Sequence, residues 1–116
     1  MEVKHILLRE FLNNDFAVST EDGDKLFHEI KGYLDSNQKV SLDFDGIVVV
    51  ITAFLNASIG SLYNNLYSDQ FIDEHLLYEN VSDSNRKYIN LVIDNAKKYF
   101  KNVDGFDKNT DDLLNG

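Results

Sequence analysis

One threonine and two aspartates carry the side chains of this sequence that are best suited to chemistry. Thr52 opens an apolar segment with helical spacing, where its hydroxyl can cap the first backbone N–H groups of the helix. A phosphate on the same hydroxyl would face the positive end of the helix dipole, so Thr52 is also a candidate phosphorylation site. We expect the capping role. Ser58 and Ser61 are weaker phosphate acceptors because they lie inside the helix.

Asp43 and Asp45 are two positions apart, so strand alternation places both carboxylates on one face, or one of them in a turn. Paired carboxylates can serve acid–base catalysis or bind a metal ion. No third ligand is near in sequence, and His5, His28 and His75 are dispersed. We therefore expect Asp45 to shape a turn and Asp43 to bind loop amides, with no catalytic residue, metal site or cofactor. A pocket that joins these aspartates to a histidine would favour an enzyme instead.

Strands and helices must alternate to position these residues. We expect strands at Val3–Leu12, Phe16–Val18, Lys39–Phe44 and His75–Val81, and helices at Thr20–Asp35, Thr52–Tyr67 and from Ser82–Ser84 to Phe100. A turn at Asn13–Asp15 would join the first two strands in a hairpin. The order β-β-α-β-α-β-α predicts an α/β fold with a mixed sheet covered by helices.

The Asp45-Gly46 dipeptide allows two readings of the segment that follows. It stands between two apolar runs, which is a strong hairpin signal, so Ile47–Ile51 could pair antiparallel with the strand before it. Alternatively, Ile47–Ile51 crosses to the helix at Thr52.

Length and charge restrict the class of protein. A chain of 116 residues supports one domain, which we place at residues 1–101, followed by an acidic tail at 102–116 that we expect to be flexible. A net charge of −9 argues against direct binding to nucleic acid or to an anionic membrane. The longest apolar run is Ile47–Ile51, there is no cysteine, and the first residues lack a signal-peptide pattern. We therefore expect a cytoplasmic protein.

A stretch of acidic residues without lysine or arginine follows the second predicted helix. Its members are Asp69, Asp73, Glu74, Glu79 and Asp83. Such a stretch usually keeps a face solvated. It could also recognise a basic protein, or mimic DNA toward a nucleic-acid-binding protein.

A family resemblance rests on the stretch Val40–Ile47, read VSLDFDGI, and on Val50–Leu55, read VITAFL. Together they resemble the STAS-like family of unknown function and, more distantly, true STAS domains, the anti-sigma-factor antagonists. The resemblance covers roughly residues 20–81 and implies a small α/β sandwich. It favours the crossing at Ile47–Ile51 over the hairpin.

The resemblance also implies a function. True STAS domains are switch modules without catalytic activity, and a kinase-type partner phosphorylates a Ser or Thr that corresponds to Thr52. Their preceding residue is normally Asp, whereas this sequence has Ile51. Members of the STAS-like family are thought to work beside histidine-kinase-like ATPases. A regulatory module of the bacterial cytoplasm that docks such a protein partner is therefore our leading hypothesis.

We place the docking surface of that module at the start of the second predicted helix. Its expected members are Asp45, Gly46, Thr52, Ala53, Phe54 and Asn56. Phe54 is either an exposed anchor or a core residue. The alternative hypothesis is an acidic inhibitor or DNA-mimicking decoy that binds a basic nucleic-acid-binding protein.

Overall fold

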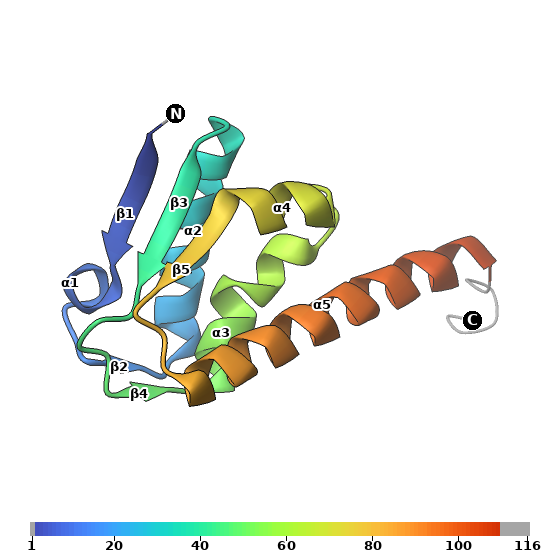
Figure 1. Ribbon diagram of the computed structural model, residues 1–116. Helices are drawn as coiled ribbons and strands as arrows, with labels where there is room; N and C mark the ends of the chain where they lie inside the picture. Colours follow the sequence, from blue (N-terminus) through green and yellow to red (C-terminus); the bar gives the residue numbers. More distant parts are fainter. Residues whose placement is uncertain (1, 110–116) are drawn as a thin grey trace.

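The computed structural model describes the backbone of residues 2–109 and the side chains of residues 2–100. Figure 1 shows strands and helices that alternate along the chain. The strands are β1 (Val3–Leu7), β2 (Phe16–Ala17), β3 (Lys39–Asp43), β4 (Val49–Val50) and β5 (Leu76–Glu79). The helices are α1 (Leu8–Leu12), α2 (Thr20–Asp35), α3 (Thr52–Ser58), α4 (Asp69–His75) and α5 (Asp83–Asn109), and a 3₁₀ helix, η1 (Gly60–Tyr63), follows α3. The predicted α/β class is confirmed.

Within these residues, the strands form two parallel sheets. The larger sheet has the order β1-β3-β5, with Leu7 opposite Asp43 and Asp43 opposite Glu79. The smaller sheet pairs β2 with β4. The prediction of a mixed sheet is wrong, because each connection between neighbouring strands of the larger sheet contains a helix that returns the chain to the same end.

The hairpin predicted at Asn13–Asp15 is also wrong. The extended segment ends at Leu7, and the next five residues form α1, which buries Leu8 completely. Leu8, Phe11 and Leu12 have the i, i+3, i+4 spacing of one helical turn, so the apolar residues fit a helix as well as a strand. Asn13 ends α1 in the left-handed conformation, and β1 and β2 enter different sheets.

The turn after β3 settles the course of the next segment. The Ile47 N–H donates to the Phe44 carbonyl over 3.0 Å, and Gly46 has a φ of 82° at the third position of this turn. Such a φ favours glycine. No antiparallel pairing of β3 with β4 follows within the described residues, since β4 pairs with β2. Ile47–Ile51 therefore crosses to α3, as the resemblance implied.

Helices α2 and α3 cover one face of the larger sheet. This face contributes Ile6, Val40, Leu42 and Leu76, which pack in one core with Leu26, Ile30 and Leu34 of α2 and with Phe54 and Leu55 of α3. A Cβ on Gly23 would lie 2.7 Å from both Ala57 Cβ and the Phe54 carbonyl oxygen. The backbones of the two helices therefore come into contact at Gly23, and the small side chain of Ala57 leaves room for this approach. The helix predicted at 52–67 is shorter, since α3 ends at Ser58.

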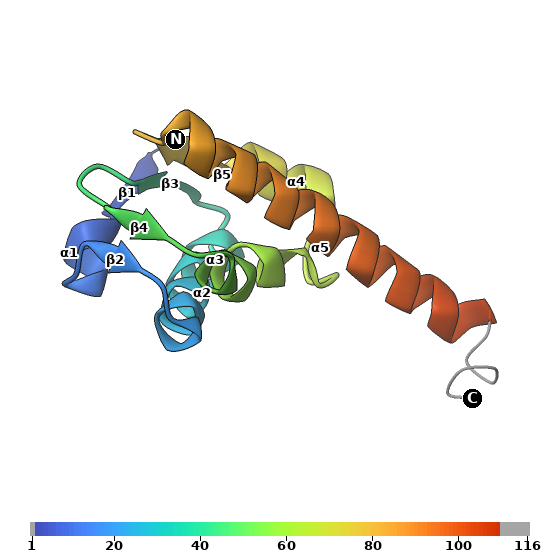
Figure 2. The same ribbon diagram turned by 90° about the horizontal axis from the view of Figure 1, so that it is seen from below.

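The opposite face of the larger sheet remains open. Within residues 2–109, Figures 1 and 2 show α2 and α3 on one side of the strands and no helix packed on the other. The side chains of Val3, His5, Leu77 and Glu79 are exposed there. Parallel sheets are usually covered on both faces. The prediction of a sheet covered by helices thus holds for one face.

Helix α5 packs against α3 and η1 and then extends away from the body of the molecule (Figure 1). Asp73 of α4 links it to the body, since its carboxylate accepts a hydrogen bond from Tyr63 Oη at 2.7 Å and lies 3.0 Å from Lys97 Nζ. Burial and this hydrogen bond raise the pKa of Tyr63 above its ordinary value. The neutral hydroxyl therefore remains a donor to Asp73.

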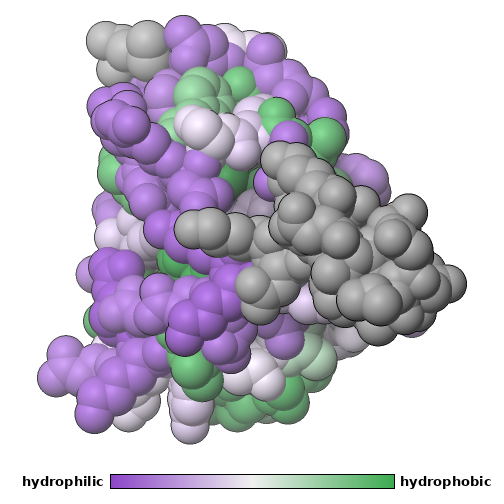
Figure 3. Space-filling model, turned by 90° about the vertical axis from the view of Figure 1, so that its right-hand side faces the viewer, coloured by the Kyte–Doolittle hydropathy of each residue, from purple (hydrophilic) through white to green (hydrophobic). Residues whose placement is uncertain are grey.

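Helix α5 is longer than the helix expected to end near Phe100. It continues to Asn109, and residues 110–116 of the expected tail lie outside the described residues. No helix in the described part of the chain is long and apolar enough to cross a bilayer. Seen from the α5 side, the surface is largely polar, with apolar residues near its upper and lower ends (Figure 3).

Candidate functional site

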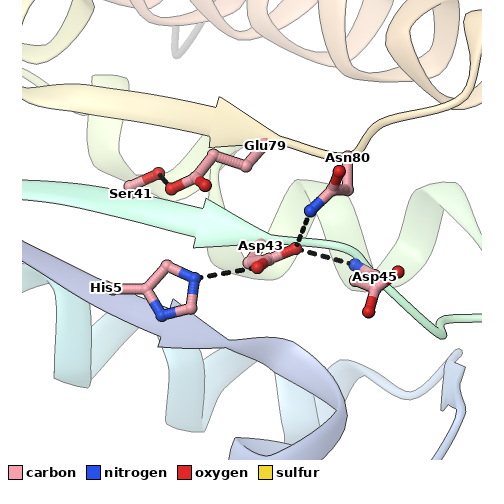
Figure 4. A network of polar contacts seen from close by, with 6 residues as sticks. All are labelled: His5, Ser41, Asp43, Asp45, Glu79 and Asn80. Carbon is pink, nitrogen blue, oxygen red and sulfur yellow. Dashed lines mark hydrogen bonds and ion pairs between the residues drawn. The ribbon is translucent and has the colours of Figure 1, made fainter.

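Polar side chains from three adjacent strands meet on the open sheet face, toward the carboxyl ends of the strands (Figure 4). The register places His5 opposite Ser41 and Asp43 opposite Glu79, and all four point to the same side of the sheet. Asn80 follows β5 directly and has a φ of 54°. In parallel α/β sheets, the carboxyl ends of the strands are where ligands usually bind.

Asp43 is the centre of this cluster. Its Oδ2 lies 2.8 Å from His5 Nε2, and its Oδ1 accepts hydrogen bonds from Asn80 Nδ2 at 2.8 Å and from the Asp45 N–H at 2.9 Å. The Asn80 hydrogen bond, with those from the Asp45 amide and His5, lowers the pKa of the Asp43 carboxyl, although desolvation opposes the shift. Asp43 therefore binds a loop amide as predicted, and a side chain from each neighbouring strand region as well.

Glu79 completes the cluster from β5. Ser41 Oγ donates a hydrogen bond to Glu79 Oε2. The donor atoms of His5, Asp43 and Glu79 all lie within 4.8 Å of one another. The side chain of Asp43 is 11% exposed and that of His5 is 51% exposed. Asp43 is therefore largely buried, whereas His5 is accessible to solvent.

The contacts limit the chemistry of the cluster. Ser41 is bonded to Glu79 and His5 to Asp43, so the described residues place no serine hydroxyl on the histidine as nucleophilic catalysis requires. The structure does join Asp43 to a histidine, the combination that would favour an enzyme, but on an open sheet face. One imidazole and two carboxylates are, however, suitable metal ligands.

Sequence reasoning found Asp43 but missed its partners. His5, Glu79 and Asn80 lie 36 to 38 positions from the residues they contact or pair with, and only the strand register brings them together. The usable signal was that polar residues end successive strands of an α/β pattern, because the carboxyl ends of parallel strands lie at one edge of the sheet.

The expected docking surface is only partly assembled. Asp45, Gly46, Thr52, Ala53 and Asn56 are exposed, as a docking surface needs. Phe54 is fully buried in the core, so its role as an exposed anchor is excluded. Asn56 does not face the β3–β4 turn. It lines an open cavity of about 220 Å³ between α3 and α5.

Thr52 does not cap α3. The N-cap is Ile51, whose carbonyl accepts hydrogen bonds from the Phe54 and Leu55 N–H groups, and no side chain caps the helix. The prediction of a capping threonine is wrong by one position, because Ile51 is the last extended residue and Thr52 is already helical. The Thr52 hydroxyl is therefore exposed and not used as a cap.

An apolar surface lies directly beside Thr52. Phe16 and Val18 from the β2 strand region, and Val49 and Ile51 from the β4 region, are exposed, whereas Ala17 and Val50 between them face the core. Phe16 pairs with Val49, so strand alternation puts these four side chains on one face of the two-stranded ribbon. We call Phe16, Val18, Val49 and Ile51 the ribbon patch. Val48, which is 69% exposed, adjoins it in sequence.

The predicted acidic surface is spread over three places. Asp69, Asp73 and Glu74 lie on α4, Glu79 ends β5 and Asp83 begins α5. Asp73 is engaged with Lys97 and Tyr63, and Glu79 is engaged with Ser41. Glu74 accepts a hydrogen bond from Gln70 Nε2 at 3.0 Å. Three of the five carboxylates therefore already have partners within the protein.

Comparison with protein families identifies the chain. Residues 22–86 match the STAS-like domain of unknown function (DUF4325). The match covers more than half of the chain, so the protein belongs to this family, and the resemblance found in the sequence is confirmed. The matched range contains Asp43, Thr52 and Glu79, whereas His5 precedes it. No curated protein and no solved structure matches the chain.

Proposed function

We propose that the protein is a non-catalytic regulatory module that docks a protein partner on the ribbon patch and the adjoining start of α3. The observation that carries this proposal is the exposure of Phe16, Val18, Val49 and Ile51 on one face of the β2–β4 ribbon, immediately before the exposed Thr52. Contiguous exposed apolar side chains mark interaction sites when a polar rim surrounds them. Asp45, in the turn before β4, and Thr52, directly after Ile51, flank the β4 part of this surface in sequence with exposed polar groups.

The aromatic anchor of this surface is Phe16. It takes the place that Phe54 could have held, because Phe54 is in the core while Phe16 is 47% exposed. Interface energy is concentrated in a few large apolar side chains near the centre of a patch. Truncation of Phe16 should therefore weaken docking more than any change at the polar rim.

Thr52 is the proposed switch at the edge of the ribbon patch. Its exposed hydroxyl follows Ile51 directly and makes no cap contact. A phosphate there adds roughly −1.5 to −2 charge next to an apolar contact surface, which opposes docking through desolvation. The family relationship supports a histidine-kinase-like ATPase as the partner that would dock and phosphorylate this position.

The test is a quantitative pull-down from the native host with tagged wild-type protein and two variants, Phe16→Ser and Leu91→Ser. Leu91 is the matched control because it is exposed to a similar extent, at 52%, on α5. We expect one protein to be recovered by wild type and by the Leu91 variant and to be lost with the Phe16 variant. Equal recovery by all three proteins would refute docking at the ribbon patch.

Two further readouts separate the alternatives. A phosphate-sized mass increase on Thr52, and weaker recovery by Thr52→Glu, would support the switch. Unchanged recovery by Thr52→Glu would exclude Thr52 as the switch. Docking on apolar residues should persist at high salt, whereas capture of a basic nucleic-acid-binding protein that is lost at high salt would instead support the acidic decoy.

A further inference from the structure

We propose that His5, Asp43 and Glu79 form a binding site for one divalent transition-metal ion on the open face of the β1-β3-β5 sheet. The three side chains come from three adjacent strands and project from the same face (Figure 4). The site lies apart from the ribbon patch in the small sheet, so this inference does not depend on the proposed docking function.

The spacing of the donor atoms suits a single ion. A zinc ion with bonds of about 2.0–2.2 Å holds its ligand atoms roughly 3.0–3.5 Å apart. His5 Nε2 and Asp43 Oδ2 are already 2.8 Å apart, and all three donor atoms lie within 4.8 Å. Glu79 is exposed, so a change of its side-chain rotamer can close the remaining distance without moving the backbone.

The contacts around the two carboxylates orient them for this role. The Asn80 amide and the Asp45 N–H hold Asp43 Oδ1, which leaves Oδ2 directed at His5. Ser41 holds one oxygen of Glu79 and leaves the other free to bind. Hydrogen bonds that fix one oxygen of a carboxylate and leave the other to the ion are the usual outer contacts of metal sites.

Charge also favours a cation at this position. Two carboxylates lie close together, and among the described side chains neither has a lysine or arginine within ion-pair distance. A divalent ion would offset their repulsion, and its bonds would replace the contact between His5 Nε2 and Asp43 Oδ2.

The ligand set selects the class of ion. One imidazole nitrogen and two carboxylate oxygens suit Zn²⁺ or Mn²⁺, while Mg²⁺ prefers oxygen and water and dehydrates reluctantly. Three protein ligands leave at least one coordination position toward solvent on the open face. We therefore expect Zn²⁺ to bind more tightly than Mn²⁺, and Mg²⁺ to bind weakest.

The test is isothermal titration of the full-length, chelator-treated protein with ZnCl₂, MnCl₂ and MgCl₂. We expect one Zn²⁺ per chain and a loss of affinity of about tenfold or more in His5→Gln, Asp43→Asn and Glu79→Gln. The matched control is His28→Gln, which removes an exposed imidazole from α2 and should bind Zn²⁺ like wild type. Asn80→Gly keeps the left-handed backbone but removes the amide, and should weaken binding by roughly 10- to 100-fold.

Folding is checked by thermal melts in chelator, and Glu79→Gln keeps the test valid if Asp43→Asn does not fold, because Glu79 is exposed. Histidine nitrogen shifts in NMR spectra identify the imidazole that binds, and we expect His5 alone to respond. Absence of Zn²⁺ binding by the wild type, wild-type affinity in Glu79→Gln, or equal losses in the His5 and His28 variants would each overturn the site.

Discussion

Replacing Gly23 by alanine should destabilise the protein, although the same change at Gly32 in the same helix should stabilise it. A Cβ on Gly23 would lie 2.7 Å from Ala57 Cβ and 2.7 Å from the Phe54 carbonyl oxygen. Ordinary contacts of this kind begin near 3.4 Å, so α2 and α3 would have to separate. Gly32 has no heavy atom within 4 Å of the same added carbon.

The expected magnitudes follow from these distances. Overpacking in a buried contact costs about 1–3 kcal/mol, and alanine recovers about 0.5–1 kcal/mol of helix propensity at either position. Gly23→Ala should therefore lower the free energy of unfolding by about 1–2 kcal/mol, while Gly32→Ala should raise it by about 0.5–1 kcal/mol. The contact partner of Gly23 is partly backbone, which cannot rotate away.

Urea unfolding followed by far-UV circular dichroism measures both variants. With a dependence of about 1.5 kcal/mol per molar urea, the two midpoints should differ by roughly 1–2 M. Ala57→Gly in the Gly23→Ala background should recover part of the loss, because it removes one of the two close atoms. Equal or greater stability of Gly23→Ala relative to Gly32→Ala would refute the close approach of α2 and α3.

Two other predictions concern the turn after β3 and the polar cluster. Gly46→Ala should lower the free energy of unfolding by about 1–2 kcal/mol in urea melts, because φ at this position is 82° and Arg9 Nε would lie 2.5 Å from the added carbon. Arg9→Ala in the same background should recover part of this loss. An unchanged free energy of unfolding in the double variant would contradict the contact. The pKa of the Asp43 carboxyl is lower in the folded protein than in the unfolded chain, where it is near 3.8. The ionised carboxyl therefore stabilises the fold above pH 3.8, and this stabilisation is lost as the pH falls through the folded pKa. Melts in chelator from neutral to acid pH should therefore show a smaller acid loss in Asp43→Asn than in wild type, and parallel curves would count against this linkage.

Local patterns predicted the elements that local signals define. Helix α2 has the predicted bounds, Thr20–Asp35, and the Ser19 hydroxyl caps it by accepting from the Asp22 N–H at 3.0 Å. The alternation predicted a strand at Lys39–Phe44, and the structure has one at Lys39–Asp43. The prediction of one strand at Val3–Leu12 was wrong because the apolar residues of this segment fit both the two-residue period of a strand and the 3.6-residue period of a helix. The chain becomes helical after Leu7, and Leu8 is then completely buried. The sheet was misjudged as mixed for the same reason, since the false hairpin supplied its antiparallel pair.

The functional groups show the same division. Asp43 and Thr52 could be singled out from their neighbours in sequence, and the amide contact of Asp43 followed from turn chemistry. The partners His5, Glu79 and Asn80 depended on the register of strands far apart in sequence, which no local pattern contains. The ribbon patch was missed because β2 and β4 are only two residues long each, and they pair with each other although they lie far apart in the sequence.

The parallel sheet also has a consequence for the order of folding. The contacts of Asp43 with His5 and Asn80 join residues 38 and 37 positions apart, and Ser41 reaches Glu79 over 38 positions. Closing a loop of that length costs roughly 3 kcal/mol of chain entropy before any contact compensates for it. The helices can form early from neighbouring residues, whereas the cluster exists only when all three strands have docked. Its assembly therefore reports the last stage of folding, and a fragment that lacks either outer strand retains only part of it.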